Sequence, residues 1–142
     1  MEEVIHYLEL KNQYYEKFYN VTLKFLRQPS EDKWNNIEFF VDNRERILNI
    51  IRSFDFKIAH FFDGRSPADI NVERYREQVR RLMEVRSQWA SKIVTLDLEL
   101  SSKIDEMKTE TIRELKRVQE TSQALDSFED RGFRAPASRK TA

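Results

Sequence analysis

The sequence predicts an all-α protein, an antiparallel bundle of three long helices, and three observations lead to this prediction. Charged residues make up 35% of the chain and hydrophobic residues 39%, a balance typical of long helices with solvated outer faces. Only two glycines and three prolines occur, too few for the many turns of a sheet protein. Apolar residues recur three and four positions apart, the period of an amphipathic helix. The 142 residues suffice for one domain with a modest core.

The first helix is expected over residues 2–28. Its apolar side chains form one broad stripe centred near Phe18, so this helix packs on one side. Pro29 ends the helix because a proline disfavours α geometry at Gln28 and has no amide proton of its own. Ser30 then offers its hydroxyl as the N-cap of the next helix.

The second helix is expected over residues 31–62, where three adjacent columns of residues repeat every seven positions. Three columns mean that this helix contacts two neighbours, so we expect it at the centre of the bundle. Arg44 and Asp55 stand in columns whose other members are apolar. Because burying a lone charge is costly, each should make a polar contact that sets the helix register or lie at the edge of the core, or else contact a protein ligand.

The third helix is expected over residues 67–128. Ser66 and Asp69 have the spacing of a capping box, with Pro67 at the first helical position, which favours a helix start here. Neither glycine nor proline occurs between residues 68 and 128. The apolar spacing stretches near Ser101-Ser102, however, and a stutter of this kind can bend or break the helix there, which would give four helices.

An apolar stripe continues along the third helix beyond the reach of the second. The third helix is about twice as long as the second, so an antiparallel partner covers it to about Leu100 and little further. We call the remainder the C-terminal stripe, and its members are Ile104, Met107, Thr111, Leu115, Val118, Leu125 and Phe128. A fourth helix, a second copy or a ligand protein must cover it, and we expect these residues to bind a partner. Residues 129–142 are predicted to form a flexible tail.

Residues that could carry chemistry are sparse. His6 and His60 lie far apart in the sequence and neither belongs to an HExxH motif. Two glycines cannot build the common phosphate-binding loops, and the absence of cysteine excludes thiolate metal sites. Paired carboxylates such as Glu110 and Glu114 are typical of a solvated helix face. The sequence therefore predicts a protein that is not an enzyme, with no catalytic residues, no metal and no cofactor.

The charge distribution limits the classes of partner. Acidic and basic residues number 25 each, so no global field gathers nucleic acid or anionic lipid. Arginines such as Arg80 and Arg81 alternate with glutamates, a pattern that favours a solvated helix over a nucleic-acid surface. No stretch approaches the ~18 consecutive apolar residues that membrane insertion requires. With no cysteine and an acidic start, we expect a cytoplasmic protein.

Two stretches of the chain resemble a known family. The first is Lys33-Trp34-Asn35-Asn36-Ile37-Glu38, followed by Asn43-Arg44-Glu45-Arg46-Ile47-Leu48; the second runs from Glu114-Leu115-Lys116 through Ala124-Leu125 and Phe128 to Arg131-Gly132-Phe133. Together with the order of the predicted helices, these stretches resemble the flagellar type III export chaperones of the FlgN and FliT kind. The resemblance implies a cytoplasmic chaperone in flagellum biogenesis. Such a chaperone binds a secretion substrate, either a hook-filament junction protein or the filament cap protein, and delivers it to the export apparatus.

A second hypothesis comes from the C-terminal stripe alone. The third helix could self-associate as a coiled coil, which would make the chain a structural protein. The sequence leaves open whether the chain is a monomer or a homodimer, and it does not identify the substrate.

Overall fold

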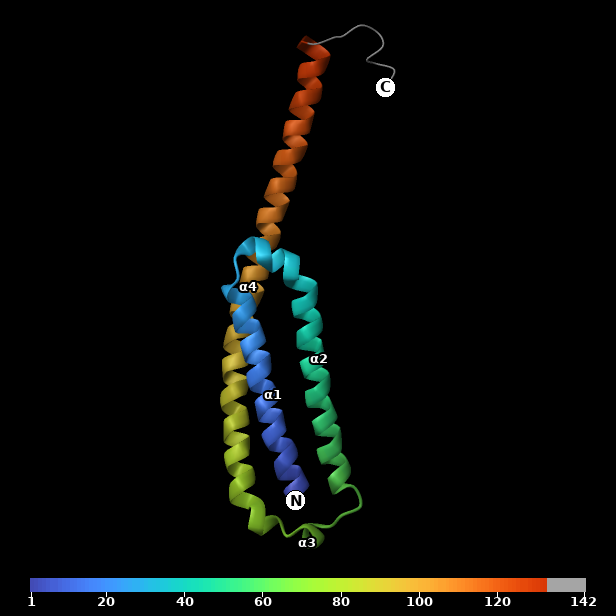
Figure 1. Ribbon diagram of the computed structural model, residues 1–142, viewed down its shortest axis with the longest axis vertical. Helices are drawn as coiled ribbons and strands as arrows, with labels where there is room; N and C mark the ends of the chain where they lie inside the picture. The colour runs from blue at the N-terminus through green and yellow to red at the C-terminus, as the bar shows by residue number, and fades with distance from the viewer. Residues whose placement is uncertain (133–142) are drawn as a thin grey trace. The chain divides into compact units, whose positions relative to one another are not determined.

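The computed structural model describes residues 1–132, except the side chains of Pro67 and of residues 129–132. It contains four helices, α1 (Glu2–Arg27), α2 (Ser30–Phe62), α3 (Pro67–Ile70) and α4 (Val72–Gly132), as Figure 1 shows. No strand occurs in this part of the chain, so the predicted all-α class is confirmed. The chain divides into two compact units, residues 1–102 and residues from 103 onward. Within the described residues, the second unit is the C-terminal part of α4.

The first unit is a bundle in which the helices run up, down and up. Figure 1 shows α2 antiparallel both to α1 and to the first part of α4. Phe18, Ile47 and Ile51 form the centre of the core. The partly buried residues packed around them are Tyr14, Tyr15, Val21, Leu48 and Ile93. The apolar faces of α1, α2 and α4 thus meet as the helical periodicity predicts.

Aromatic pairs join α1 to α2 near both ends of their interface. Phe25 stacks on Phe40 with ring centroids 4.0 Å apart and an interplanar angle of 8°. Tyr7 stacks on Phe54 at 6.0 Å. Rings of this size bury much apolar area, so these contacts are a large part of what holds the two helices together.

Two of the three heptad columns of α2 face the core. The column that contains Phe40, Ile47 and Phe54 is buried at these three positions, and Ile51 is buried in its neighbour. The remaining column is more open, because its outer members Trp34, Val41 and Phe62 are 40%, 55% and 39% exposed. This column therefore lies at the edge of the core rather than within it.

The N-cap of α2, in the turn that follows α1, is a different residue from the one predicted. Gln28 adopts an extended conformation ahead of Pro29, as the steric effect of proline requires. Pro29 itself occupies the N-cap position, and α2 begins at Ser30, so the Ser30 hydroxyl is not the cap that was predicted. The Lys33 ammonium group instead reaches back and donates a hydrogen bond to the Gln28 carbonyl oxygen.

The third predicted helix breaks at Asn71 and not at Ser101-Ser102. The Ser66 amide and hydroxyl both donate to Asp69 Oδ2, at 3.1 and 2.8 Å, and complete the predicted capping box. That helix, α3, lasts one turn, because Asn71 takes a left-handed conformation with φ 52° that asparagine tolerates better than most residues. From Val72 the helix is continuous through both serines to Gly132. It includes the first four residues of the predicted tail, and residues 133–142 lie outside the described residues.

Arg44 and Asp55, the two charged residues in the apolar columns of α2, each form an ion pair with a neighbouring helix. Asp55 pairs with Lys11 of α1, whose side chain is only 6% exposed. The Arg44 guanidinium lies 3.2 Å from Asp97 Oδ1 of α4 and also donates to Oδ2 at 3.3 Å. Its planar group lies over the Phe18 ring, 4.4 Å from the centroid, as well as near the Phe40 ring at 5.4 Å. Arg44 therefore contacts side chains of α1, α2 and α4 within the first unit.

Replacing Arg44 with methionine should destabilise the bundle by about 1–3 kcal/mol, because Asp97 then keeps a half-buried charge without a cation. The free energy of unfolding in urea, followed by circular dichroism, measures the loss. The double variant R44M/D97N should recover part of it. Arg52→Met is the matched control, since the Arg52–Glu45 pair is exposed and its loss should change stability by less than ~0.5 kcal/mol. Equal effects of R44M and R52M would contradict the structural role of Arg44.

The capping box should make stability depend on pH. Hydrogen bonds from the Ser66 hydroxyl and amide hold the pKa of the Asp69 carboxyl below its ordinary value of 3.8. Ionised Asp69 therefore favours the folded state above that pH, and this contribution is lost as the pH falls through the lowered pKa. The difference in melting temperature between wild type and D69N should be present at pH 7 and shrink below pH 3.8. The pH dependence should be weaker in S66A, which removes the hydroxyl donor but keeps the backbone amide that also donates to Asp69. A constant difference for D69N across this range would rule out the carboxylate as its cause.

Candidate protein-binding surface

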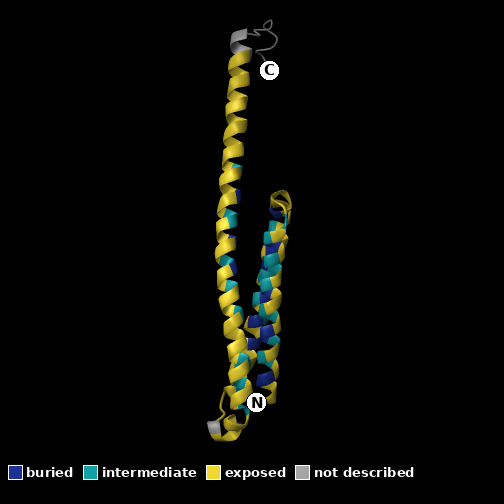
Figure 2. Ribbon diagram, turned by 90° about the vertical axis from the view of Figure 1, so that its left-hand side faces the viewer, coloured by how far each residue is buried: buried dark blue, intermediate teal, exposed yellow. Residues whose placement is uncertain are grey.

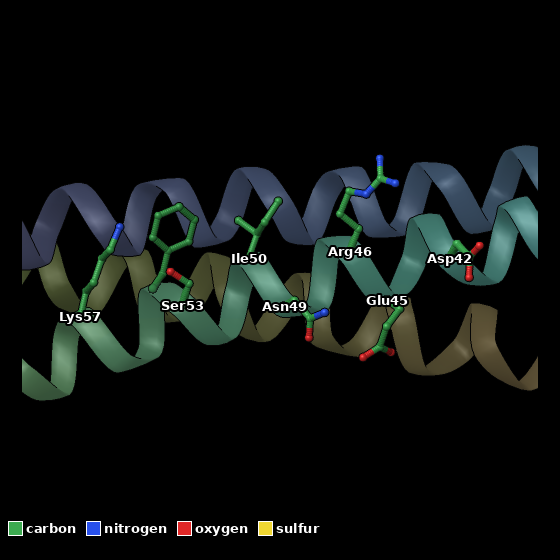
Figure 3. Close-up of a pocket in the computed structure, with 8 residues that line it drawn as sticks. Asp42, Glu45, Arg46, Asn49, Ile50, Ser53 and Lys57 are labelled. Atoms are coloured by element: carbon green, nitrogen blue, oxygen red, sulfur yellow. The ribbon is translucent and has the colours of Figure 1, made fainter.

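A surface depression along α2 lacks the convergent groups of an active site. It has a volume of about 560 Å³ and is lined by eight residues that all belong to α2. Figure 3 shows Arg46 and Ile50 extending toward α1, whereas Glu45 and Asn49 extend to the opposite side of the helix. Acidic and basic side chains that diverge in this way cannot act together on one substrate atom.

The remaining candidates for chemistry are exposed on helix surfaces. His60 stacks on Phe56 with centroids 6.2 Å apart, and its Nδ1 lies 3.9 Å from Asp63 Oδ2. Both side chains of this pair are more than three-quarters exposed. Among the side chains that the structure describes, no three of histidine, cysteine, aspartate or glutamate are grouped so that they could hold a metal ion.

The arginines at the start of α4 are occupied by neighbouring glutamates. The Arg80 guanidinium hydrogen bonds to Glu77 Oε1 at 2.6 Å, which lowers the pKa of the Glu77 carboxyl and raises the pKa of Arg80. Arg81 also donates to Glu77 at 3.3 Å, so the predicted i,i+4 pair forms. This face of the helix is a network of exposed ion pairs, as the alternation of charges predicts.

The proximal part of the C-terminal stripe is covered. Ile104 and Thr111 are half-buried, and Met107 is 1% exposed. The Thr111 hydroxyl donates to the Met107 carbonyl oxygen at 3.0 Å, so its polar group is satisfied within the helix. Met107 is therefore not part of the exposed apolar surface.

The distal part of the C-terminal stripe is exposed. Leu115, Val118, Leu125 and Phe128 are 58%, 66%, 57% and 57% exposed, respectively. Figure 2 shows this stretch of α4 as almost entirely exposed ribbon. The structure thus separates the seven predicted residues into three that are covered and four that remain accessible.

Several exposed apolar residues lie outside the predicted site. Ile112 is 54% exposed and sits beside the C-terminal stripe, while Val94 and Leu98 form a pair on α4 that is 61% and 69% exposed. Phe39 and Phe56 of α2 are each 72% exposed. Neither phenylalanine belongs to any of the three heptad columns, so the sequence pattern could have indicated that both are exposed.

Comparison with known protein families, with curated proteins and with solved structures gives no match to this chain. A membrane-spanning segment is likewise not found: within residues 1–132, none of the helices combines the length and hydropathy needed to cross a bilayer.

Because the chain has no cysteine, single cysteine variants can test the division of the C-terminal stripe. A thiol at position 115 should react with a small maleimide at close to the rate of a free thiol. A thiol at position 107 should react at least ~10-fold more slowly, since it is reached only through local opening. The rates can be followed by mass spectrometry. Similar rates for M107C and L115C would contradict the burial of Met107.

Proposed function

We propose that this chain is a protein-binding module that holds an amphipathic helix of a partner protein along the distal part of the C-terminal stripe. The observation that carries this proposal is the exposure of Leu115, Val118, Leu125 and Phe128 on one helix. Isolated exposed apolar residues are ordinary, but a row of four at helical spacing is typical of a helix-binding surface.

The spacing of these residues suits a helical ligand. Leu115 and Phe128 are 13 positions apart, about 20 Å along the helix at 1.5 Å per residue, which matches three to four turns of a partner helix. Thr121, Ser122 and Ala124 lie between Val118 and Leu125 and are small. Small residues between large ones leave room for the side chains of a second helix to insert.

The expected affinity of the stripe alone is low. Completing the burial of four half-exposed apolar side chains contributes roughly 1–2 kcal/mol each. Their sum offsets only the lower part of the cost of association, about 4–15 kcal/mol, so binding through the stripe alone is weak and readily reversible. Reversible binding is what a chaperone needs, because it must release its substrate.

The resemblance to flagellar type III export chaperones supplies the class of partner. The ligand would be a terminal amphipathic helix of a hook-filament junction protein or of the filament cap protein. Holding that helix on the stripe would keep it from assembling in the cytoplasm before export. The exposed apolar face of the distal stripe supports this role.

Charge substitutions within the C-terminal stripe test the proposal. The double variant L115D/V118D should weaken binding of such a terminal helix by at least ~100-fold, because two carboxylates would be desolvated against an apolar face. Fluorescence anisotropy with a labelled peptide of each candidate substrate measures the affinity. Circular dichroism should show unchanged helicity, since both positions are exposed.

The matched control is V94D/L98D, which places the same two charges on exposed apolar positions of the same helix. This control should bind as the wild type does. Equal affinities for wild type and L115D/V118D would refute the proposed surface. If wild type dimerises in sedimentation experiments and L115D/V118D is monomeric, the stripe instead serves self-association.

A further inference from the structure

A second pocket lies between α1 and α2, far along the chain from the C-terminal stripe. We call it the α1–α2 pocket, and it is lined by Val21, Lys24, Phe25 and Gln28 of α1 and by Asn36, Phe39, Phe40 and Asn43 of α2. Its volume is about 240 Å³. A cavity of about 150 Å³ accommodates benzene, so this space is large enough for one apolar side chain.

The apolar part of the α1–α2 pocket is rigid on one side and open on the other. Phe25 and Phe40 are 3% and 5% exposed and stack on each other at 4.0 Å, so they form a fixed surface. Phe39 stands beside them with 72% of its surface exposed. An accessible aromatic residue next to a preformed apolar surface is the usual composition of a binding hot spot.

A hydrogen-bond acceptor in the α1–α2 pocket is unsatisfied. Gln28 Oε1 is buried and accepts no hydrogen bond from any residue that the structure describes. A buried acceptor without a donor is unfavourable, and a ligand N–H group would relieve that cost. Gln28 lines the pocket, but its Oε1 is closed off from solvent, so a ligand N–H group can reach it only after the Gln28 side chain turns toward the pocket.

The charges of the residues that line the α1–α2 pocket favour one class of ligand. Lys24 is the charged residue of the lining, and the other polar members, Gln28, Asn36 and Asn43, carry carboxamides. Ammonium and carboxamide N–H groups together complement a carboxylate. Neither aspartate nor glutamate belongs to the lining, so a basic ligand finds no counterpart there.

We propose that the α1–α2 pocket binds an acidic peptide segment of a partner protein, one that places a large apolar side chain next to an aspartate or glutamate. The apolar side chain packs on Phe25, Phe39 and Phe40. The carboxylate of the segment pairs with Lys24, and once the Gln28 side chain turns into the pocket, its Oε1 accepts a hydrogen bond from a backbone N–H of the segment. This site uses different helices from the C-terminal stripe and does not depend on the function proposed for it.

Two capped tripeptides test this site, acetyl-Asp-Leu-Glu-amide and acetyl-Lys-Leu-Lys-amide. They are too short to cover the C-terminal stripe. In two-dimensional NMR spectra of the full chain, the acidic peptide should cause saturable shifts of the side-chain amide signals of Gln28, Asn36 and Asn43, with a dissociation constant of about 1–10 mM. The basic peptide should not shift them.

Matched variants distinguish this pocket from unspecific binding. Phe39→Ala should raise the dissociation constant at least ~5-fold. Phe56→Ala removes an equally exposed phenylalanine from the same helix and should leave it unchanged. Lys24→Glu should reverse the preference, so that the basic peptide binds better than the acidic one.

Three results would overturn the proposal: equal shifts with both peptides, no saturable shift at about 10 mM, or equal effects of F39A and F56A. Shifts confined to residues 112–128 would overturn it as well, while leaving the proposed function of the C-terminal stripe intact. Shifts of the pocket signals that appear on concentrating the protein alone would show that a second copy occupies the pocket. The variant L115D/V118D should bind the acidic tripeptide normally, so failure of one proposal is separable from failure of the other.

Discussion

The guanidinium group of Arg44 contacts all three long helices of the bundle formed by residues 1–102. It lies over the Phe18 ring of α1, close to the Phe40 ring of its own helix, and within 3.2 Å of Asp97 on α4. A cation in this position is stable only while all of these partners are in place, because its charge is largely removed from water. The relative positions of the three helices are therefore coupled through one side chain.

A second ion pair complements the first. Asp55 and Lys11 connect α2 to α1 near the other end of the interface, whereas Arg44 connects α2 to both neighbours. Apolar burial provides most of the stabilisation, but it would tolerate a shift of one helix along another. A shift of one turn would separate both ion pairs, so the charges select one register among several that would bury similar area.

The two proposed surfaces follow from how the apolar residues are distributed. In the first unit the α1–α2 interface buries Phe25 and Phe40 and leaves Phe39 accessible beside them. Along α4, burial ends after Met107 and Thr111, and the apolar residues that follow are exposed. The first surface offers a pocket for one side chain with a charge preference, while the second offers an extended face. They suit different ligand segments.

The sequence by itself determined the helical class, the ends of α1 and α2 to within two residues, the capping box at Ser66 and the need of Arg44 and Asp55 for partners. These features depend on local periodicity, on proline and on the cost of a lone charge. Only the tertiary structure decided that the chain breaks at Asn71, since a left-handed asparagine is permitted locally but not required. Tertiary structure likewise decided that Met107 is buried and Leu115 exposed, because periodicity shows which residues share a helix face and not which part of that face is covered.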